Sequence, residues 1–168
     1  MELFCQGDEK AFDALFDRHA PAVRGYLLRM VASAALADDL TQTTFLSLVR
    51  ARGRFIKGSR FKPWLYAIAT NAARDSRRRR KEQLTATGDL PADEGEEMAV
   101  RDLGMEKQVH AALGKLPDAQ REAILQHRFH GISFAELAAA EGVSESAVKV
   151  RAHRGYEQLR VLLKGLWP

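Results

Sequence analysis

The sequence predicts an all-α protein with two small helical domains joined by a flexible acidic linker. Three observations predict it. Apolar side chains recur every three to four residues along most of the chain, which is the spacing of one helix face. No segment has the alternation of apolar and polar residues that is typical of a strand. Residues 82–105 interrupt the helical pattern, because Gly, Pro and acidic residues dominate there.

The length and the apolar content agree with two domains. A chain of 168 residues suffices for two small domains, and 46% hydrophobic residues can supply a core to each. We place the domains at residues 1–81 and 106–168, with the linker at 82–105.

Charge divides at the same boundaries. Residues 1–81 carry 16 basic and 8 acidic side chains, a net charge of +8. Residues 82–105 have a net charge of −6, and residues 106–168 have a net charge of +2. Two basic segments on either side of an acidic one permit a polyanionic partner such as nucleic acid.

Helix starts and stops give the order of elements. In the first domain, Gly7-Asp8 and Pro21 each mark a helix start, and the small residues 32–34 precede a third helix. Residues 52–60 contain two glycines and no apolar stripe, which predicts a loop. The helix that begins near Pro63 is expected to end through five consecutive cations, residues 77–81. Helical pattern resumes near Met105, and a further helix starts at residues 116–118.

Several classes of site are not expected. Cys5 is the only cysteine, so a disulfide within the chain and a thiolate metal cluster are ruled out. His127 and His130 have no third ligand nearby, and we expect a structural or surface role for them and no metal or cofactor. The first eight residues lack the pattern of a secretory signal, and no stretch approaches the length of a membrane-spanning helix. These features predict a cytoplasmic protein with no insertion into a membrane.

Residues 134–153 have the spacing of a helix-turn-helix. We expect helices at 134–141 and from Glu145 onward, with Gly142 in the left-handed turn and Ser144 as N-cap of the second helix. Ala138 is small where the helices would cross, and Val148 would pack against Leu137. The outward side of the second helix then carries short polar and cationic groups, Ser146, Lys149, Val150, His153 and Arg154. Such a helix can enter the major groove of DNA. The alternative for this window is a plain helical hairpin.

Residues 61–71 interleave aromatic and basic side chains. A basic loop precedes this segment and the five cations follow it. Unpaired bases can stack on aromatic rings while cations contact phosphates, so the segment suits single-stranded nucleic acid. The alternative is that Phe61, Trp64 and Ile68 belong to the core and that the cations are a solvated helix end. Residues 38–45, taken alone, form an ordinary amphipathic helix.

Together these segments resemble the sigma-70 family, and within it the extracytoplasmic-function (ECF) group. The resemblance covers nearly everything outside residues 82–105, in the family's order and spacing. It rests on the opening helix at 11–19, the segment 39–45, the segment 54–71, and the segments 116–122, 131–138 and 148–154.

The resemblance implies a function and its residues. The chain would bind core RNA polymerase, recognise the −35 and −10 promoter elements, and promote DNA melting. Contacts with the clamp of the largest polymerase subunit would come from Asp39, Leu40, Gln42 and Phe45. The −10 element would be held by Phe55, Arg60, Phe61, Ile68 and Asn71, with Trp64 and Tyr66 supporting that site. The −35 element would face Ser144, Ser146, Lys149, Arg151, His153 and Arg154.

The resemblance implies further partners as well. The second domain would meet the flap of the second-largest polymerase subunit, and an anti-sigma factor would hold both domains inactive. The acidic linker would thread near the RNA exit path, where it is either an RNA-like occupant of a basic channel or a soluble tether.

Two other functions remain open at this point. A self-sufficient helix-turn-helix regulator would explain residues 134–153 but would leave residues 61–71 without a role. A helical enzyme or scaffold would need a polar pocket, and the sequence offers no nucleophile–base pair or metal-ligand set.

Overall fold

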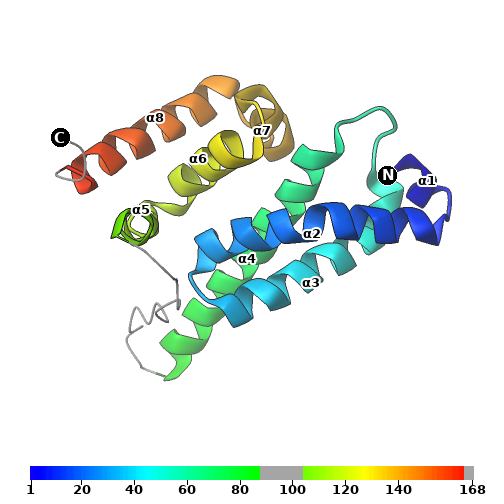
Figure 1. Ribbon diagram of the computed structural model, residues 1–168, viewed down its shortest axis with the longest axis horizontal. Helices are drawn as coiled ribbons and strands as arrows, with labels where there is room; N and C mark the ends of the chain where they lie inside the picture. The colour runs from blue at the N-terminus through cyan, green and yellow to red at the C-terminus, as the bar shows by residue number, and fades with distance from the viewer. Residues whose placement is uncertain (88–103, 165–168) are drawn as a thin grey trace. The chain divides into compact units, whose positions relative to one another are not determined.

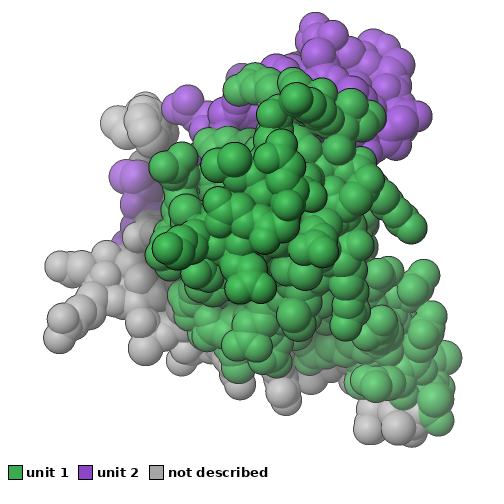
Figure 2. Space-filling view, turned by 90° about the vertical axis from the view of Figure 1, so that its right-hand side faces the viewer, with its two compact units in different colours: residues 1–97 green, residues 98–168 purple. Residues whose placement is uncertain are grey.

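The computed structural model describes residues 1–87 and 104–164, and the chain forms two compact units, residues 1–97 and 98–168 (Figure 2). All regular structure within the described residues is helical. This confirms the all-α prediction. Most of the predicted linker, residues 88–103, lies outside the described residues.

Three long helices form the first unit. They are α2 (Glu9–Val31), α3 (Ala34–Ala51) and α4 (Phe61–Thr87), and each packs against the other two (Figure 1). A short helix, α1 (Glu2–Cys5), precedes them, and a 3-10 turn, η1 (Arg52–Arg54), follows α3. The core between the long helices contains fully buried side chains from all three, Tyr26, Leu27, Leu48, Leu65 and Tyr66. An exposed ion pair between Arg24 and Asp38 also joins α2 to α3, with 2.5 Å between Nε and Oδ1.

Local capping explains the break between α2 and α3. Ala32 ends α2 in the left-handed conformation, with φ 56° and ψ 19°. Ser33 then caps α3, because its side chain accepts a hydrogen bond from the Leu36 N–H. Asp8 caps α2 in the same way through the Ala11 N–H. The predicted helix start at residues 7–8 and the break at residues 32–34 are therefore confirmed.

Pro21 does not begin a new helix, and that prediction was wrong. Helix α2 continues through Pro21. A proline inside a helix lacks the N–H that would bond the carbonyl four residues earlier. The helix persists because the following turns carry Val23, Tyr26 and Leu27, all fully buried, and their packing outweighs one missing bond.

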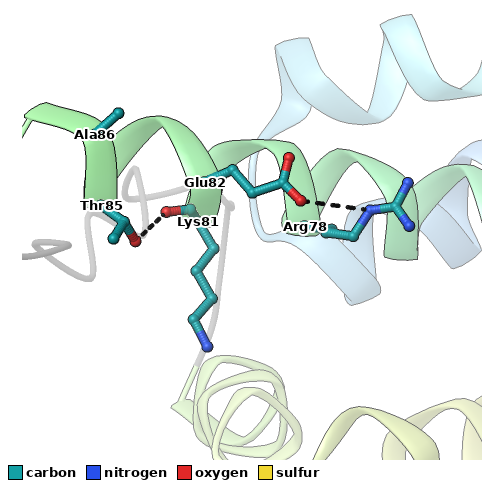
Figure 3. A pocket seen from close by; sticks show the side chains of 5 residues that line it. All are labelled: Arg78, Lys81, Glu82, Thr85 and Ala86. Carbon is teal, nitrogen blue, oxygen red and sulfur yellow. Dashed lines mark hydrogen bonds and ion pairs between the residues drawn. The ribbon is translucent and has the colours of Figure 1, made fainter.

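Helix α4 runs six residues past Lys81, into the segment predicted as linker. The added turns contain good helix formers, Glu82, Gln83, Leu84 and Ala86. Two local contacts support them (Figure 3): Arg78 Nε lies 3.9 Å from Glu82 Oε1, and Thr85 Oγ1 donates to the Lys81 carbonyl at 2.8 Å. The acidic composition of the segment concealed this helical end.

The second unit contains α5 (Gly104–Gly114), α6 (Asp118–His130), α7 (Phe134–Glu141) and α8 (Glu145–Leu162). Helix α8 packs against each of the other three. Gly155 permits a close approach of α8 to α6, because a Cβ at this position would lie 2.6 Å from Ile124 Cδ1 and 3.2 Å from Gln120 Cβ. Leu125, Ile132, Leu137 and Val148 are buried in this core.

None of the helices in the described ranges, 1–87 and 104–164, is long and apolar enough to cross a membrane.

Candidate nucleic-acid interface

Three of the predicted aromatic residues meet in one cluster. The ring of Phe55, which follows η1, lies 5.2 Å from the ring of Trp64 and 6.4 Å from that of Phe61. The Phe61 and Trp64 rings of α4 are themselves 6.4 Å apart. All three side chains are half-buried, so part of each side chain reaches the surface. The cluster can therefore offer ring faces to a flat ligand such as a base.

The first three turns of α4 also align Ile68 and Asn71 with this cluster. Phe61, Trp64, Ile68 and Asn71 are spaced three, four and three residues apart, which places them on one helix face. Ile68 is half-buried and Asn71 is exposed. An apolar side chain beside a free amide is a surface that can contact both the face and the edge of a base.

Tyr66 lies on the opposite side of α4, in the core. It is 1% exposed, and its ring meets the Tyr26 ring edge-on at 5.3 Å. Burial raises the pKa of the Tyr66 phenol, so this group stays protonated. Tyr66 therefore supports the position of α4 and presents no surface to a nucleic acid.

His19 of α2 joins the ring cluster and is a residue that was not among the predicted site residues. Its imidazole meets the Phe61 ring edge-on at 5.1 Å. Partial burial, and then the positive charges of Arg18 and Lys62, lower the pKa of His19 below its usual 6.5. The sequence did indicate that His19 packs with the rings, because it lies on the same apolar stripe as Leu15 and Phe16.

The loop beside the cluster is basic and exposed. Arg54, Lys57 and Arg60 are exposed, and Ile56 at the loop tip is 74% exposed. Gly58 adopts φ +82°, which a glycine tolerates and most residues do not. The loop thus places cations around the rings, as expected for a surface that contacts phosphates.

On α3 the predicted residues divide between surface and core. Asp39 and Gln42 are exposed, but Leu40 is 6% exposed and Phe45 is 2% exposed. The expectation that Leu40 and Phe45 contact a partner directly disagrees with this placement. Both lie on the apolar stripe that packs against the neighbouring helices, and Phe45 meets the Phe16 ring at 4.8 Å. They hold α3 in place.

Leu46 is the surface residue that the sequence analysis missed. It is 58% exposed and follows Asp39 by seven residues, so the two share a helix face with Gln42 and Thr43. Leu46 therefore adds one apolar side chain to the polar exposed face of α3. The sequence did contain a signal for this exposure. The buried stripe of α3 passes through residues 44, 45 and 48, and Leu46 does not lie on it.

The second unit forms a helix-turn-helix as predicted. Helix α7 has the predicted bounds, because Ser133 and Glu136 make a capping box at its start and Gly142 ends it with φ 67°. Ser144 caps α8 through the Ala147 N–H. These caps fix where α7 ends and where α8 begins.

The outward face of α8 carries most of the predicted DNA-facing residues. Exposed on or beside this face are Ser144, Ser146, Lys149, Val150, His153 and Arg154. The Ser144 and Ser146 hydroxyls are 3.0 Å apart at the helix start, and Lys149 Nζ lies 2.7 Å from Glu145 Oε1. The positive N-terminal end of the helix dipole and the cations give this face a polyanion-binding character.

Arg151 is placed differently. Its Nη1 lies 2.5 Å from Glu141 Oε2 at the end of α7, and its side chain is 30% exposed. Arg151 thus joins the two helices of the motif. The resemblance implied a DNA-facing role, but this side chain turns towards α7, because position 151 borders the buried positions 148, 152 and 155.

His127 of α6 has structural contacts. The His127 ring stacks on the Phe134 ring at 4.0 Å, and its Nδ1 lies 2.9 Å from the Ile132 carbonyl oxygen. The described residues hold no group of three or more His, Cys, Asp or Glu side chains suited to a metal ion.

The fold defines an all-α protein of two compact helical units, the second of which contains a helix-turn-helix. Comparisons with known proteins identify its family. The family model of sigma-70 region 2 matches residues 15–83, and the family model of sigma-70 region 4 matches residues 106–159. The chain belongs to the sigma-70 family of RNA polymerase sigma factors, in the ECF group.

Three relatives illustrate the similarity. The RNA polymerase sigma factor CarQ of Myxococcus xanthus is 45% identical over 170 residues, covering 97% of this chain and 95% of that protein. NccH of Alcaligenes xylosoxydans is 34% identical, covering 95% and 90%. The sigma factor RpoE of Bartonella quintana, solved in complex with the anti-sigma factor NepR, superposes with a TM-score of 0.81 at 27% identity and covers 93% of this chain and 98% of that one.

Family membership decides between the functions that the sequence left open. A sigma factor brings RNA polymerase to promoters and takes part in transcription initiation there. The comparisons favour this function over a self-sufficient helix-turn-helix regulator, because they include a match to region 2, which such a regulator lacks.

Proposed function

We propose that the first unit of this sigma factor captures unpaired −10 bases on the ring cluster and that the outward face of α8 reads the −35 element. The observation that carries this proposal is the alignment of the ring cluster with Ile68 and Asn71 on one face of α4, beside a basic loop. A plain helical core would bury these rings more completely than the half-burial seen here.

The energies suit promoter opening. Each base pair that opens costs on the order of 1.4 kcal/mol of stacking. Stacking of an unpaired base on an aromatic side chain returns about 1–3 kcal/mol. A few captured bases, with Arg60 and its neighbours contacting the strand, are of the size needed to favour the open form. Ile68 would contact the face of a flipped base, and Asn71 would bond its edge.

For the −35 element, the α8 face would enter the major groove. His153 and Lys149 are central on this face, and Arg154 flanks it. Ser144 and Ser146 stand where the helix start would meet a phosphate. Arg151 would act through its ion pair with Glu141, by fixing the angle between α7 and α8.

For the polymerase, the exposed face of α3 is the proposed clamp-binding surface. Asp39 and Gln42 would make polar contacts, and Leu46 would supply the apolar anchor that Leu40 and Phe45 cannot supply from the core. The second unit would meet the polymerase flap. The polymerase would catalyse RNA synthesis, and this chain would have no enzymatic role. The chain would act in the cytoplasm.

The domain division at residues 1–81, 82–105 and 106–168 remains a proposal. The two region matches, 15–83 and 106–159, support it. The polymerase would set the separation of the two units, with the acidic segment as tether. We also propose control by an anti-sigma factor, because the structure of RpoE from Bartonella quintana contains one.

A promoter selection tests these assignments. The chain is mixed with core RNA polymerase and a DNA library randomised upstream of a transcribed reporter, and transcribed molecules are sequenced. We expect two conserved blocks at a fixed separation. Asn71→Ala should relax base preference only in the downstream block, and His153→Ala only in the upstream block. Relaxation of the opposite block by either variant would refute the assignment of surfaces.

A further inference from the structure

Helix α1 lies against the start of the loop between α3 and α4 (Figure 1). Three contacts join them. The Gly58 N–H donates to Glu2 Oε1 at 3.3 Å, and the Cys5 thiol donates to the Arg52 carbonyl oxygen at 3.3 Å. The Arg52 guanidinium lies over the Phe4 ring, 5.7 Å from its centroid. This contact set spans both the beginning and the tip of the loop.

Helix α1 is itself fixed to the helical bundle. Phe4 is 4% exposed, and its ring lies 5.3 Å from the Phe12 ring of α2. The Phe12 ring in turn meets the Phe45 ring of α3 edge-on at 6.3 Å. Because Phe4 is packed in this way, Glu2 and Cys5 hold the loop from a support that belongs to the core.

The loop has little regular structure of its own. The Ser59 N–H bonds the Ile56 carbonyl at 3.0 Å, and Gly58 is in the left-handed region. Phe55, at the start of the loop, belongs to the ring cluster, while Ile56 and Lys57 are exposed. The position of the loop tip beside the rings thus depends on contacts from outside the loop, and Glu2 supplies one at the tip.

We propose that α1 is a positioning element for promoter opening, with Glu2 holding the loop at residues 55–60 in the conformation that receives an unpaired base. The inference rests on the proposed capture of −10 bases by the ring cluster. A loop already held in its bound conformation loses less conformational entropy when the strand docks, and this favours opening. Glu2 acts through the loop and is a positioning residue.

Three substitutions in the full chain separate positioning from general effects of charge. Glu2→Ala removes the acceptor for the Gly58 N–H. Glu2→Gln keeps an oxygen acceptor and removes only the charge. Glu9→Ala is the matched control, because it removes an exposed acid from the first turn of α2 that takes no part in the three loop contacts.

Two measurements are made on each variant. The first is the rate of promoter opening by the polymerase complex, at a promoter recovered by the library selection. The second is the labelling rate of Cys5 by a fluorescent maleimide, resolved on a gel as the 18.8 kDa band. Cys5 is the only cysteine of the chain, so this band reports α1 alone.

We expect Glu2→Ala to slow opening and to speed labelling of Cys5, each by about two- to tenfold, the range for loss of one hydrogen bond. Glu2→Gln and Glu9→Ala should behave like the unmodified chain, and binding to an isolated −35 duplex should not change. If Glu2→Ala speeds the labelling of Cys5 but leaves the rate of promoter opening unchanged, the inference is overturned. It is also overturned if Cys5 of Glu2→Ala is labelled at the rate of the unmodified chain. If the unmodified chain opens no promoter, the proposed function fails and the inference fails with it.

Discussion

Arg151 and Glu141 form an ion pair between the two helices of the helix-turn-helix, with 2.5 Å between Nη1 and Oε2. The pair is partly buried, at 30% and 21% side-chain exposure, so solvent screens it less than an exposed pair. Arg151 thus points towards α7, unlike the other cations of α8, which face outward. Helix α8 therefore contains one cation that joins it to α7 and others that face outward, and their substitutions should have different effects.

Arg151→Ala should destabilise the fold. We expect the free energy of unfolding to fall by about 1 kcal/mol, between the values for exposed ion pairs and for hydrogen bonds to buried charges. Urea unfolding followed by circular dichroism measures the change. Glu141→Gln should cost a similar amount, and the double variant should cost less than the two single costs added together. Strict additivity would show that the pair makes no net contribution.

Arg154→Ala should weaken DNA binding without loss of stability. Arg154 is exposed beside the outward face of α8, and the described residues show no ion pair or hydrogen bond for it. If Arg154 contacts a phosphate, its loss should lower the slope of log affinity against log salt by about 1. Binding to a −35 duplex at several salt concentrations measures this slope. Lys115→Ala removes an exposed charge from the loop after α5 and should leave the slope unchanged.

Gly155→Ala should destabilise the second unit. The new methyl would lie 2.6 Å from Ile124 Cδ1, and the overpacking should cost about 1–3 kcal/mol. The gain in helix propensity, about 1 kcal/mol, offsets only part of this cost. In urea unfolding, Ile124→Val should be less harmful in the Gly155→Ala background than alone, because it removes the clashing atom.

Gly25→Ala is the control for this substitution. At Gly25 the nearest atom to a new Cβ is the flexible end of Arg29, at 3.4 Å. The free energy of unfolding of Gly25→Ala should equal or exceed that of the unmodified chain. An equal loss at both glycines would contradict the packing explanation.

His19 should make the stability of the fold depend on pH. Its pKa is lowered from 6.5 in the folded chain, mainly by burial, so the unfolded chain binds the proton more readily. Stability should therefore fall as the pH decreases through the region just below 6.5. Urea unfolding at about pH 7 and pH 5.5 should show a larger loss for the unmodified chain than for His19→Gln. Equal losses in both chains would exclude His19 as the cause.

Local signals predicted α7 and its turn well. Its bounds depend on groups within a few residues, since Ser133, Glu136 and Gly142 form caps at the ends of the same short helix. Caps of this kind can be recognised without knowledge of the rest of the fold. The helix start predicted at residues 7–8 succeeded for the same reason, because Asp8 caps α2.

Packing between helices decided what local patterns did not. Pro21 signals a helix start, but the buried residues after it keep α2 continuous. Leu40 and Phe45 match the pattern of a binding helix, yet only the neighbouring helices show that these side chains face the core. Position 151 borders the outward face of α8, and the presence of Glu141 on α7 decides where Arg151 points. Contacts between residues distant in sequence decide such cases.

The most direct test of two-element recognition measures DNA opening. The chain, core RNA polymerase and a selected promoter are combined, and unpaired thymines in the −10 element are detected by their reactivity with permanganate. We predict reactive thymines only with polymerase present, and about five- to hundredfold less opening with Asn71→Ala, the effect of losing about 1–3 kcal/mol of base recognition. Binding to the isolated −35 duplex should be unchanged. Tight binding of the free chain to palindromic duplex DNA, with no association with polymerase and no opening, would contradict the account.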